Sequence, residues 1–371
     1  MHRPYLRLCA LILLSSLFLL CTVQLIASAE EHPDAISARA ACLLEAGRCE
    51  QLYGKNENLR LPMASTTKIV TCLVALEHAN LDEIVTVDAR ACGVEGSSLY
   101  LKVGEKMTVL DLLYGLMLRS ANDAAEAIAL YLSGSIEGFC ELMNDKARAL
   151  GLSDTHFDNP HGLDSPQHYT TARELAIISA SAMQNDTFRQ IVKTKRHLIA
   201  RGTESARLLV NHNRLLSLYD GAVGIKTGFT RKCGRTLVGA AEREGVTLIS
   251  VTLDAPCDWS DHKALFDYGF SQMERRVLVS EGEYAYDLPV IGADADTLRV
   301  MNTEGFTHIA HRDEPNARIE ITIPRYLVAP IEKGATVGKI RVKLSDGTVH
   351  DIPVVASEAV LSKGRRRFLF F

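Results

Sequence analysis

The sequence predicts an α/β (α+β) fold, in which an antiparallel sheet carries a helical subdomain and a small C-terminal all-β domain follows. Three patterns support this fold class. Strand-like segments occur at both ends of the first 275 residues, and helix-like segments fill the stretch between them. Two of the late strands are separated only by the turn Glu244-Gly245, which is typical of an antiparallel hairpin. From about Val277, short alternating segments are divided by Gly, Asp and Pro, and no helix-length period appears.

The first elements follow from their periods and their end signals. The segment ARAACLLEAGRCEQLYGKNEN alternates and turns at Ala46-Gly47, so it predicts two strands. The apolar residues of LPMASTTKIVTCLVALEHA cover most of a helical circumference, which predicts a helix buried nearly all round. Two further helical runs break near Arg119-Ser120-Ala121 and end at Gly134. Thr171 and Glu174 have the spacing of a capping box at the start of a later helix.

The remaining elements are predicted from the same periods. The helices are SIEGFCELMNDKARALGL and the closing SDHKALFDYGFSQM, and the strands of the first domain are GAVGIKTGFT, GRTLVGAAER and VTLISVTLDA. The β domain is expected to contain the strands YAYDLPV, ARIEITI, KIRVKL and VHDIPVVA. The chain is therefore expected to divide into a signal segment (1–29), a catalytic domain (30–275) and a β domain (276–371).

Residues 1–29 are expected to be a signal peptide. A short positive region, MHRPYLR, precedes an apolar run, and Ala27-Ser28-Ala29 has the small-residue pattern of a cleavage site. The alternative is an uncleaved transmembrane anchor, because the run is nearly long enough to span a bilayer. Four polar residues interrupt the run and favour cleavage: Ser15, Ser16, Thr22 and Gln24. Both alternatives place the rest of the chain outside the cytoplasm.

The composition argues against several function classes. The 371 residues carry a formal net charge of −4, so bulk electrostatics gives no basis for binding nucleic acid. His, Cys, Asp and Glu show no zinc-ligand spacing, and we expect neither a metal nor another cofactor. Nine cysteines include Cys9 and Cys21 in the signal segment, and the odd number that follows implies an unpaired thiol or no disulfide at all. Cys42 and Cys49 are the only close pair, and a disulfide there is our guess.

A serine and a lysine stand three residues apart where the buried helix begins. Ser65 and Lys68 project from the same side of that helix. A serine hydroxyl is a poor nucleophile until a base removes its proton, and a buried lysine can supply that base because burial disfavours the ammonium. Backbone N–H groups at the helix start would stabilise negative charge on an attacked carbonyl oxygen. Taken alone, the pair could equally be an N-cap serine and a lysine whose charged end reaches solvent.

Two further motifs decide between these alternatives. Ser120-Ala121-Asn122 falls at the helix break, where its side chains can point into a cleft, and Lys226-Thr227-Gly228 lies on a predicted strand. Alone, the first would be a helix cap and the second an ordinary strand lysine. All three motifs in this order, each in fitting local structure, exceed coincidence. A second S-x-x-K, Ser260 to Lys263, lies in the charged stretch DWSDHK and is interpreted as surface helix.

The three motifs resemble those of the serine D-alanyl-D-alanine carboxypeptidases, low-molecular-mass penicillin-binding proteins of the peptidase S11 type. The segments MASTTKIVTCLVALE, LYGLMLRSANDAAEAIA, THFDNPHGLDSPQHYTTARELAII and GAVGIKTGFT are also similar to that family, from about residue 38 to about residue 290. The resemblance implies a serine penicillin-recognising fold. It also implies that the chain removes the terminal D-alanine from peptidoglycan pentapeptide stems without a cofactor, and that β-lactams acylate the same serine.

The resemblance implies a catalytic role for three side chains and two backbone groups. Ser65 would be the acylated nucleophile, Lys68 its general base, and Ser120 the relay that protonates the leaving amine. The backbone N–H groups of Ser65 and Phe229 would form the oxyanion hole, which is usually among the largest catalytic contributions.

The same resemblance implies the substrate-binding residues. Asn122 would bind the substrate backbone, Lys226 and Thr227 would hold its terminal carboxylate, and Gly228 would let that backbone approach closely. Many relatives carry an arginine shortly before the YGF helix that helps to bind this carboxylate. The corresponding stretch here, DAPCDWSDH, has none, so we expect Lys226 and Thr227 to carry more of the binding.

Three rival functions would use part of the same pattern. A class A β-lactamase needs a deacylating glutamate in a Glu-x-x-Leu-Asn segment, and the dipeptide Leu-Asn occurs nowhere in this chain. A D,D-endopeptidase acting on peptidoglycan cross-links would use every residue named above. A non-catalytic wall-binding protein would not be expected to keep all three motifs intact.

The signal segment implies the location, and the resemblance implies the partners. We expect a secreted or cell-envelope protein whose partners are the peptidoglycan stem peptide and β-lactam antibiotics. The C-terminal SKGRRRFLFF is a basic cluster followed by four apolar residues, too short for the amphipathic membrane helix of many relatives. It is either a frayed tail or a weak contact with an anionic membrane surface.

Overall fold

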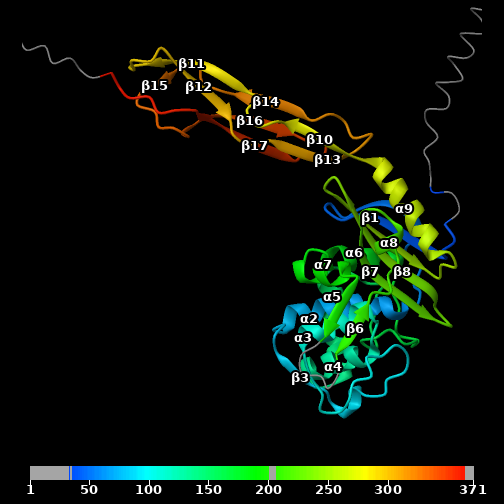
Figure 1. Cartoon of the computed structure of the whole chain (residues 1–371). Helices are drawn as coiled ribbons and strands as arrows, with labels where there is room; N and C mark the ends of the chain where they lie inside the picture. The colour runs from blue at the N-terminus through cyan, green and yellow to red at the C-terminus, as the bar shows by residue number, and fades with distance from the viewer. Residues whose placement is uncertain (1–32, 34–35, 200–205, 364–371) are drawn as a thin grey trace, which may run out of the picture.

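The computed structural model describes residues 33, 36–199 and 206–363, which form two parts linked along the chain by one helix (Figure 1). The predicted signal peptide and most of the basic tail lie outside these residues. The strands and helices of the first part are β1 (Ala40–Glu45), β2 (Glu50–Lys55), η1 (Ala64–Thr67), α2 (Lys68–His78), β3 (Ile84–Thr86), η2 (Ala89–Ala91), β4 (Lys106–Thr108), α3 (Val109–Leu118), α4 (Asn122–Ser133), α5 (Ile136–Ala149), α6 (Ala172–Ala182), α7 (Asp186–Lys193), β5 (Arg196–Ile199), β6 (Arg207–Val210), α8 (Leu215–Leu218), β7 (Ala222–Thr230), β8 (Gly234–Arg243), β9 (Val246–Leu253) and α9 (Asp258–Gln272).

Five strands form the central sheet of this part, in the order β2-β1-β9-β8-β7, and every neighbouring pair is antiparallel. Because successive side chains of β1 point to opposite faces of the sheet, the strand contributes to two apolar cores. Its residues Cys42 and Leu44 face a core shared with α6, whereas Ala41 and Leu43 face a second core shared with α9. β1 is therefore buried along its whole length. β7 is left at the edge of the sheet, where it contacts η1 and α7.

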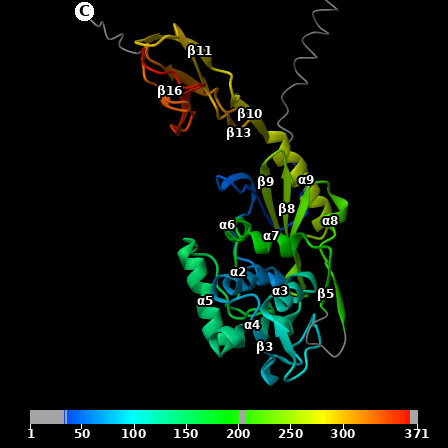
Figure 2. The same ribbon diagram turned by 60° about the vertical axis from the view of Figure 1, so that its left-hand side comes forward.

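Helix α2 forms the centre of the helical subdomain. Residues 68–75 are all buried, and α3, α4, α5 and α6 contact the helix (Figure 2). The apolar pattern around its whole circumference reflects this burial, as the sequence predicts. The predicted cap of α6 is also present, because Thr171 Oγ1 accepts a hydrogen bond from the Glu174 backbone N–H at 3.1 Å. The capping box is only half formed, since the Glu174 carboxylate turns to two N–H groups of a neighbouring loop.

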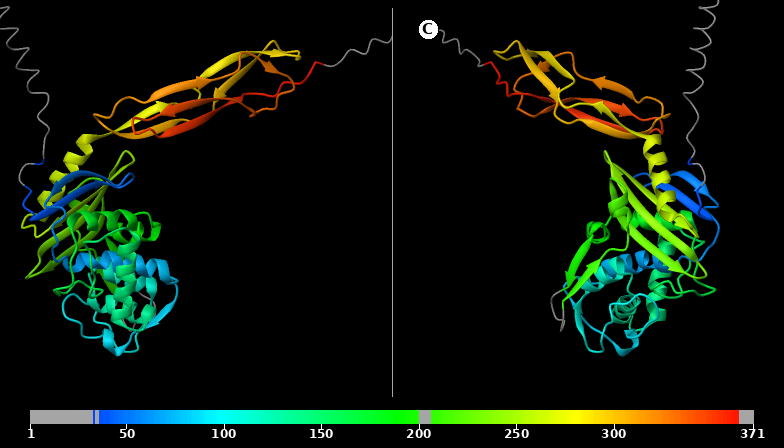
Figure 3. Two further views of the ribbon diagram at one scale, coloured as in Figure 1. Left: turned by 180° about the vertical axis from the view of Figure 1, so that it is seen from behind. Right: turned by 45° about the vertical axis from the view of Figure 1, so that its right-hand side comes forward.

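The second part is the all-β domain that the sequence predicts. Six of its strands form one sheet in the order β14-β16-β17-β12-β11-β15, and β10 and β13 pair separately. This domain has an apolar core of its own. It is elongated and extends from the end of α9, away from the helical subdomain (Figure 3). Its strands are β10 (Met273–Val279), β11 (Ala285–Ile291), β12 (Thr297–Asn302), β13 (Phe306–His311), β14 (Arg318–Thr322), β15 (Leu327–Val328), β16 (Thr336–Lys343) and β17 (Val349–Ala356).

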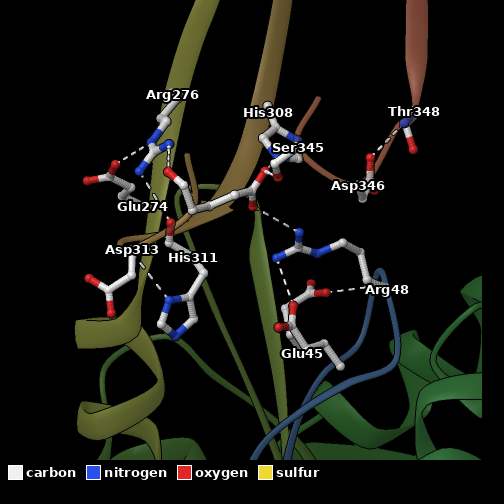
Figure 4. Close-up of polar contacts among 12 residues, drawn as sticks. Glu45, Arg48, Glu274, Arg276, His308, His311, Asp313, Ser345, Asp346 and Thr348 are labelled. Atoms are coloured by element: carbon white, nitrogen blue, oxygen red, sulfur yellow. Dashed lines mark hydrogen bonds and ion pairs between the residues drawn. The ribbon is translucent and has the colours of Figure 1, made fainter. Parts of the chain in front are cut away.

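A polar cluster joins the two parts where the β1–β2 turn reaches the β domain (Figure 4). Arg48 of that turn forms an ion pair with Glu314 at 3.3 Å. The Glu314 carboxylate also contacts His308 Nε2 at 2.8 Å and accepts a hydrogen bond from Ser345 Oγ at 3.2 Å. Arg276 Nη1 donates to the Glu314 carbonyl at 2.6 Å. We call these five residues the junction cluster.

One expectation needs correction. The seven cysteines that follow the signal segment are all free, so the guess of a Cys42–Cys49 disulfide is wrong. The reason is geometric: Cys42 is buried within β1, whereas Cys49 lies exposed in the following turn with a φ of 53°.

The sequence patterns did not predict several elements, namely α7, α8, the β3–β4 and β5–β6 hairpins, and strands β10, β12, β13 and β15. No helix in the described part of the chain is long and apolar enough to cross a membrane.

Candidate active site

Three separate segments bring the predicted residues together at one end of the sheet. η1 carries Ser65 and α2 begins with Lys68, Ser120 lies between α3 and α4, and α4 begins with Asn122. β7 passes beside η1 and carries the KTG motif. A cavity of about 530 Å³ opens there. Five of the predicted site residues line it: Ser65, Ser120, Thr227, Gly228 and Phe229.

Lys68 is fully buried although it carries a titratable amine. Its Nζ lies 3.0 Å from Ser65 Oγ, 2.6 Å from Asn122 Oδ1 and 2.6 Å from the carbonyl oxygen of His161. Burial lowers the pKa of Lys68 well below its ordinary value, and the nearby positive charge of Lys226 lowers it further. The amine is therefore suited to be neutral at rest.

The three partners of Lys68 determine the direction of each hydrogen bond. A neutral amine has two N–H donors and one lone pair, and carbonyl oxygens only accept. Asn122 presents its oxygen to Lys68 because its Nδ2 donates to the Glu95 carbonyl at 2.5 Å. Asn122 Oδ1 and the His161 carbonyl thus take both N–H groups of the neutral amine. The lone pair is left for the hydroxyl proton of Ser65.

The backbone at Ser65 has an unusual conformation. Ala64, the preceding residue, has a φ of 48°, which side-chain-bearing residues rarely adopt. Two glycines leave room for this turn. A Cβ on Gly162 would lie 1.9 Å from the Ala64 carbonyl oxygen, and one on Gly228 would lie 3.0 Å from the Ser65 nitrogen. The glycine of the KTG motif therefore allows β7 to pass close to the N–H of the predicted nucleophile.

Ser120 stands at the predicted helix break. Its φ is 61°, and its side chain reaches the cavity although the residue is only 5% exposed. The helix that follows is anchored by Asp123, whose carboxylate accepts hydrogen bonds from the backbone N–H groups of Leu99 and Leu101, each at 3.0 Å. These bonds tie the chain before α3 to the start of α4, and so fix the position of the break.

A functional contribution that the motifs did not reveal comes from the segment NPHGLD. Its His161 carbonyl is one of the three partners of Lys68, and its Pro160 carbonyl accepts a hydrogen bond from Thr71 Oγ1 at 2.6 Å. The His161 ring lies 3.4 Å from Glu126, and burial lowers the pKa of that ring. The segment had been singled out only by resemblance, because a backbone carbonyl leaves no residue-type signal.

Lys226 differs from its neighbours in the KTG motif. It is buried and does not line the cavity, whereas Thr227, Gly228 and Phe229 do. Its Nζ donates to the Thr227 carbonyl at 2.9 Å, and no acidic side chain among the described residues forms an ion pair with it. Burial lowers the pKa of Lys226 to about 7.

The second S-x-x-K lies on α9, and its Ser260 is exposed, as the sequence predicts. Six cavity-lining residues were not singled out as site residues from the sequence: Ser97, His212, Arg214, Arg235, Asp258 and Trp259. Among the described residues, no group of three or more His, Cys, Asp or Glu side chains is arranged to hold a metal ion.

Comparison with known proteins gives two family matches. Residues 27–257 match the family model described as D-alanyl-D-alanine carboxypeptidase, of the peptidase S11 type. Residues 274–362 match the model described as the C-terminal domain of penicillin-binding protein 5.

Individual relatives agree with these matches. The D-alanyl-D-alanine carboxypeptidase DacF of Bacillus subtilis is 31% identical over 342 residues, covering 90% of this chain and 88% of the relative. The D-alanyl-D-alanine carboxypeptidase of Streptomyces sp. K15 is 39% identical over 256 residues, covering 64% and 88%. The crystal structure of the carboxypeptidase DacD from Francisella tularensis superposes with a TM-score of 0.63 at 27% identity, covering 90% of this chain and 95% of that one.

Proposed function

The chain belongs to the D-alanyl-D-alanine carboxypeptidase family, and from this premise we propose that Ser65, Lys68 and Ser120 carry its chemistry. The enzyme is a serine hydrolase that removes the terminal D-alanine of peptidoglycan stem peptides, and penicillins are its inhibitors. The relatives are named as carboxypeptidases, so the endopeptidase and wall-binding alternatives are not favoured.

The acylation step follows from the hydrogen bonds of Lys68. The neutral amine takes the hydroxyl proton of Ser65 as Oγ bonds to the carbonyl carbon of the penultimate D-alanine. The C–N bond to the terminal D-alanine then breaks, and the proton passes from Lys68 through Ser120 to the leaving nitrogen. In the second half of the reaction, Lys68 takes a proton from a water molecule whose oxygen attacks the ester carbonyl carbon. The ester C–O bond then breaks, and the proton passes from Lys68 to Ser65 Oγ, which restores the free serine. The observation that carries this proposal is the fully buried Lys68 Nζ, 3.0 Å from Ser65 Oγ.

Substrate binding uses the free edge of β7. An extended peptide can pair with an edge strand through main-chain hydrogen bonds, and Gly228 keeps that edge close to Ser65. The backbone N–H groups of Ser65 and Phe229 would hold the oxyanion, and Asn122 would bind the substrate backbone beside Lys68. Lys226, on the same face of β7 as Gly228, adds positive charge near Lys68.

The boundaries and the location are part of the same proposal. We place the change from catalytic domain to β domain near residue 275, because α9 ends at Gln272 and β10 begins at Met273. The family acts in the cell envelope, which agrees with export by a signal peptide at residues 1–29. Attachment of the C-terminal tail to an anionic membrane surface would explain its three consecutive arginines.

The test is to map the penicillin adduct. After brief reaction with benzylpenicillin, digestion and mass spectrometry should find the added mass on the peptide that contains Ser65 and not on the one that contains Ser260. Enzyme from the same preparation that has not been treated with benzylpenicillin should release D-alanine from a peptide that ends in D-Ala-D-Ala. An adduct on any other serine would overturn the assignment of the nucleophile.

A further inference from the structure

The cavity beside Ser65 contains a surplus of positive charge that the three motifs do not supply. Arg214 and Arg235 line it together with one acidic residue, Asp258, which leaves a formal charge of +1 on its wall. His212 also lines the cavity, but burial lowers the pKa of its ring, so it is largely neutral at pH 7. A positive cavity beside the nucleophile suits a substrate whose chain end is a carboxylate.

Strand register places Arg235 on the same face of the sheet as Thr227. In the β7–β8 pair, Phe229 is opposite Arg235 and Thr227 is opposite Leu237. Residues opposite one another share a face, and diagonal neighbours such as Thr227 and Arg235 lie about 7–8 Å apart, within reach of a long side chain. Lys226 alternates to the opposite face, which is the one that Gly228 presents to Ser65, and it does not line the cavity.

Asp258 orients the Arg235 side chain. Arg235 Nε donates to Asp258 Oδ2 at 3.1 Å, and the aspartate side chain is 5% exposed whereas the arginine side chain is 47% exposed. The other Asp258 oxygen accepts the backbone N–H of Trp259 at 3.0 Å, which fixes the carboxylate at the start of α9. Because Asp258 engages Nε, the two terminal nitrogens of Arg235 remain available for paired hydrogen bonds to another carboxylate.

Arg214 is the other arginine of the cavity, and it is held differently. Its guanidinium lies over the Trp259 ring, 5.9 Å from the ring centre. No carboxylate among the described residues forms an ion pair with it. It adds charge to the cavity without the fixed geometry that Asp258 gives to Arg235.

We propose that Arg235, oriented by Asp258 and acting with Thr227, binds the terminal carboxylate of the stem peptide. This inference rests on the carboxypeptidase activity stated above, and it moves recognition of the chain end from Lys226 to Arg235. A guanidinium stays charged throughout the working pH range, whereas the amine of Lys226, whose pKa is about 7, loses its charge above neutrality. The oriented, permanently charged guanidinium of Arg235 is therefore a better partner for a carboxylate than the amine of Lys226.

The experiment compares two peptides that end in D-Ala-D-Ala, one with a free carboxylate and one with a C-terminal amide. Full-length enzyme, Arg235→Gln and Arg231→Gln are assayed by single-turnover release of D-alanine or its amide, with enzyme in excess. Arg231 is the matched control, because it is an exposed arginine of the β7–β8 turn outside the cavity. Arg235→Lys and Asp258→Asn complete the set.

We expect Arg235→Gln to lower kcat/KM on the free acid roughly 10- to 100-fold, the equivalent of one charge-assisted hydrogen bond, and on the amide less than threefold. Arg231→Gln should change neither value by more than twofold. Arg235→Lys should recover part of the loss, and Asp258→Asn should lose part of the preference for the free acid. Equal losses on both peptides, or a selective loss with Arg214→Gln in place of Arg235→Gln, would overturn the proposal. Wild-type enzyme that processes neither peptide would instead overturn the proposed function, and this inference with it.

Discussion

Two polar clusters in this molecule are built from similar hydrogen bonds but lie in different surroundings. Around Lys68, a fully buried amine meets Ser65, Asn122 and a backbone carbonyl. In the junction cluster, Glu314 meets Arg48, His308 and Ser345, and the Arg48 side chain is 34% exposed. Each central group therefore has three partners, but Lys68 is fully buried whereas the Glu314 side chain is 12% exposed.

The difference shows that burial, more than the number of bonds, decides what a polar cluster does. Desolvation of Lys68 lowers its pKa and makes it a base. Burial of Glu314 would raise its pKa, but the hydrogen bond from His308 and the neighbouring charges outweigh it and hold the pKa below its usual value. The first cluster lowers the stability of the fold and is chemically active, whereas the second changes the stability little and has a structural role. The predictions below test this contrast.

The largest effect is expected at the nucleophile. Ser65→Ala should abolish labelling by a fluorescent penicillin, because no acyl-enzyme can form without its hydroxyl. Ser260→Ala is the matched control, since it removes the serine of the exposed S-x-x-K copy and should leave labelling intact. In-gel fluorescence reports both. Labelling that persists in Ser65→Ala would show that another residue is acylated.

Replacement of the base should have the next largest effect. An arginine keeps the charge of Lys68 but cannot lose its proton, so Lys68→Arg should lower the acylation rate about 10²- to 10⁴-fold. In the wild type, acylation should fall on the acid side as Lys68 takes up a proton, because only the neutral amine accepts the serine proton. Stopped-flow acylation across pH measures both effects. Near wild-type rates in Lys68→Arg would mean that another group is the base.

Much of the candidate active site around Lys68 could be predicted from the sequence. The period of residues 69–76 marked a helix buried all round, and a lysine at its first turn is conspicuous for that reason. The break at Ser120 was also recognisable, because the helical pattern fails there and resumes at Asn122. These signals are local, and side-chain type carries them.

The remaining parts depend on backbone and on register, which leave little trace in one sequence. The His161 carbonyl could have been supplied by any residue type, and the φ of Ala64 follows from its neighbours. Arg235 reaches the cavity only because of the β7–β8 register. The junction cluster joins residues more than 260 positions apart, so no local pattern indicates it.

Lys226 tests the cost of a buried charge. Its folded pKa is about 7 against 10.5 for the free side chain, so below pH 7 both states hold the proton and the folded state bears the full desolvation cost. That cost shrinks as pH rises from 7 toward 10.5. Lys226→Met should therefore increase the free energy of unfolding, and by of order 2 kcal/mol more at pH 6 than at pH 9. Urea unfolding at both pH values measures this. A gain that does not depend on pH would mean that the ammonium is not desolvated.

The smallest effects are expected at the junction cluster. Arg48→Gln removes one partner of a partly exposed carboxylate and should lower the free energy of unfolding by less than about 1 kcal/mol, with kcat/KM unchanged within twofold, because Arg48 does not line the cavity.

Since the pKa of Glu314 is lowered in the folded protein, the contribution of its carboxylate to the free energy of unfolding is complete above the unfolded pKa and is lost as pH falls through the folded value. The difference in unfolding midpoint between wild type and Glu314→Gln should therefore be constant above about pH 5 and narrow in more acidic buffer. Differential scanning calorimetry of both proteins from pH 3 to pH 8 measures it, and a difference that widens in acid would contradict this account of the junction.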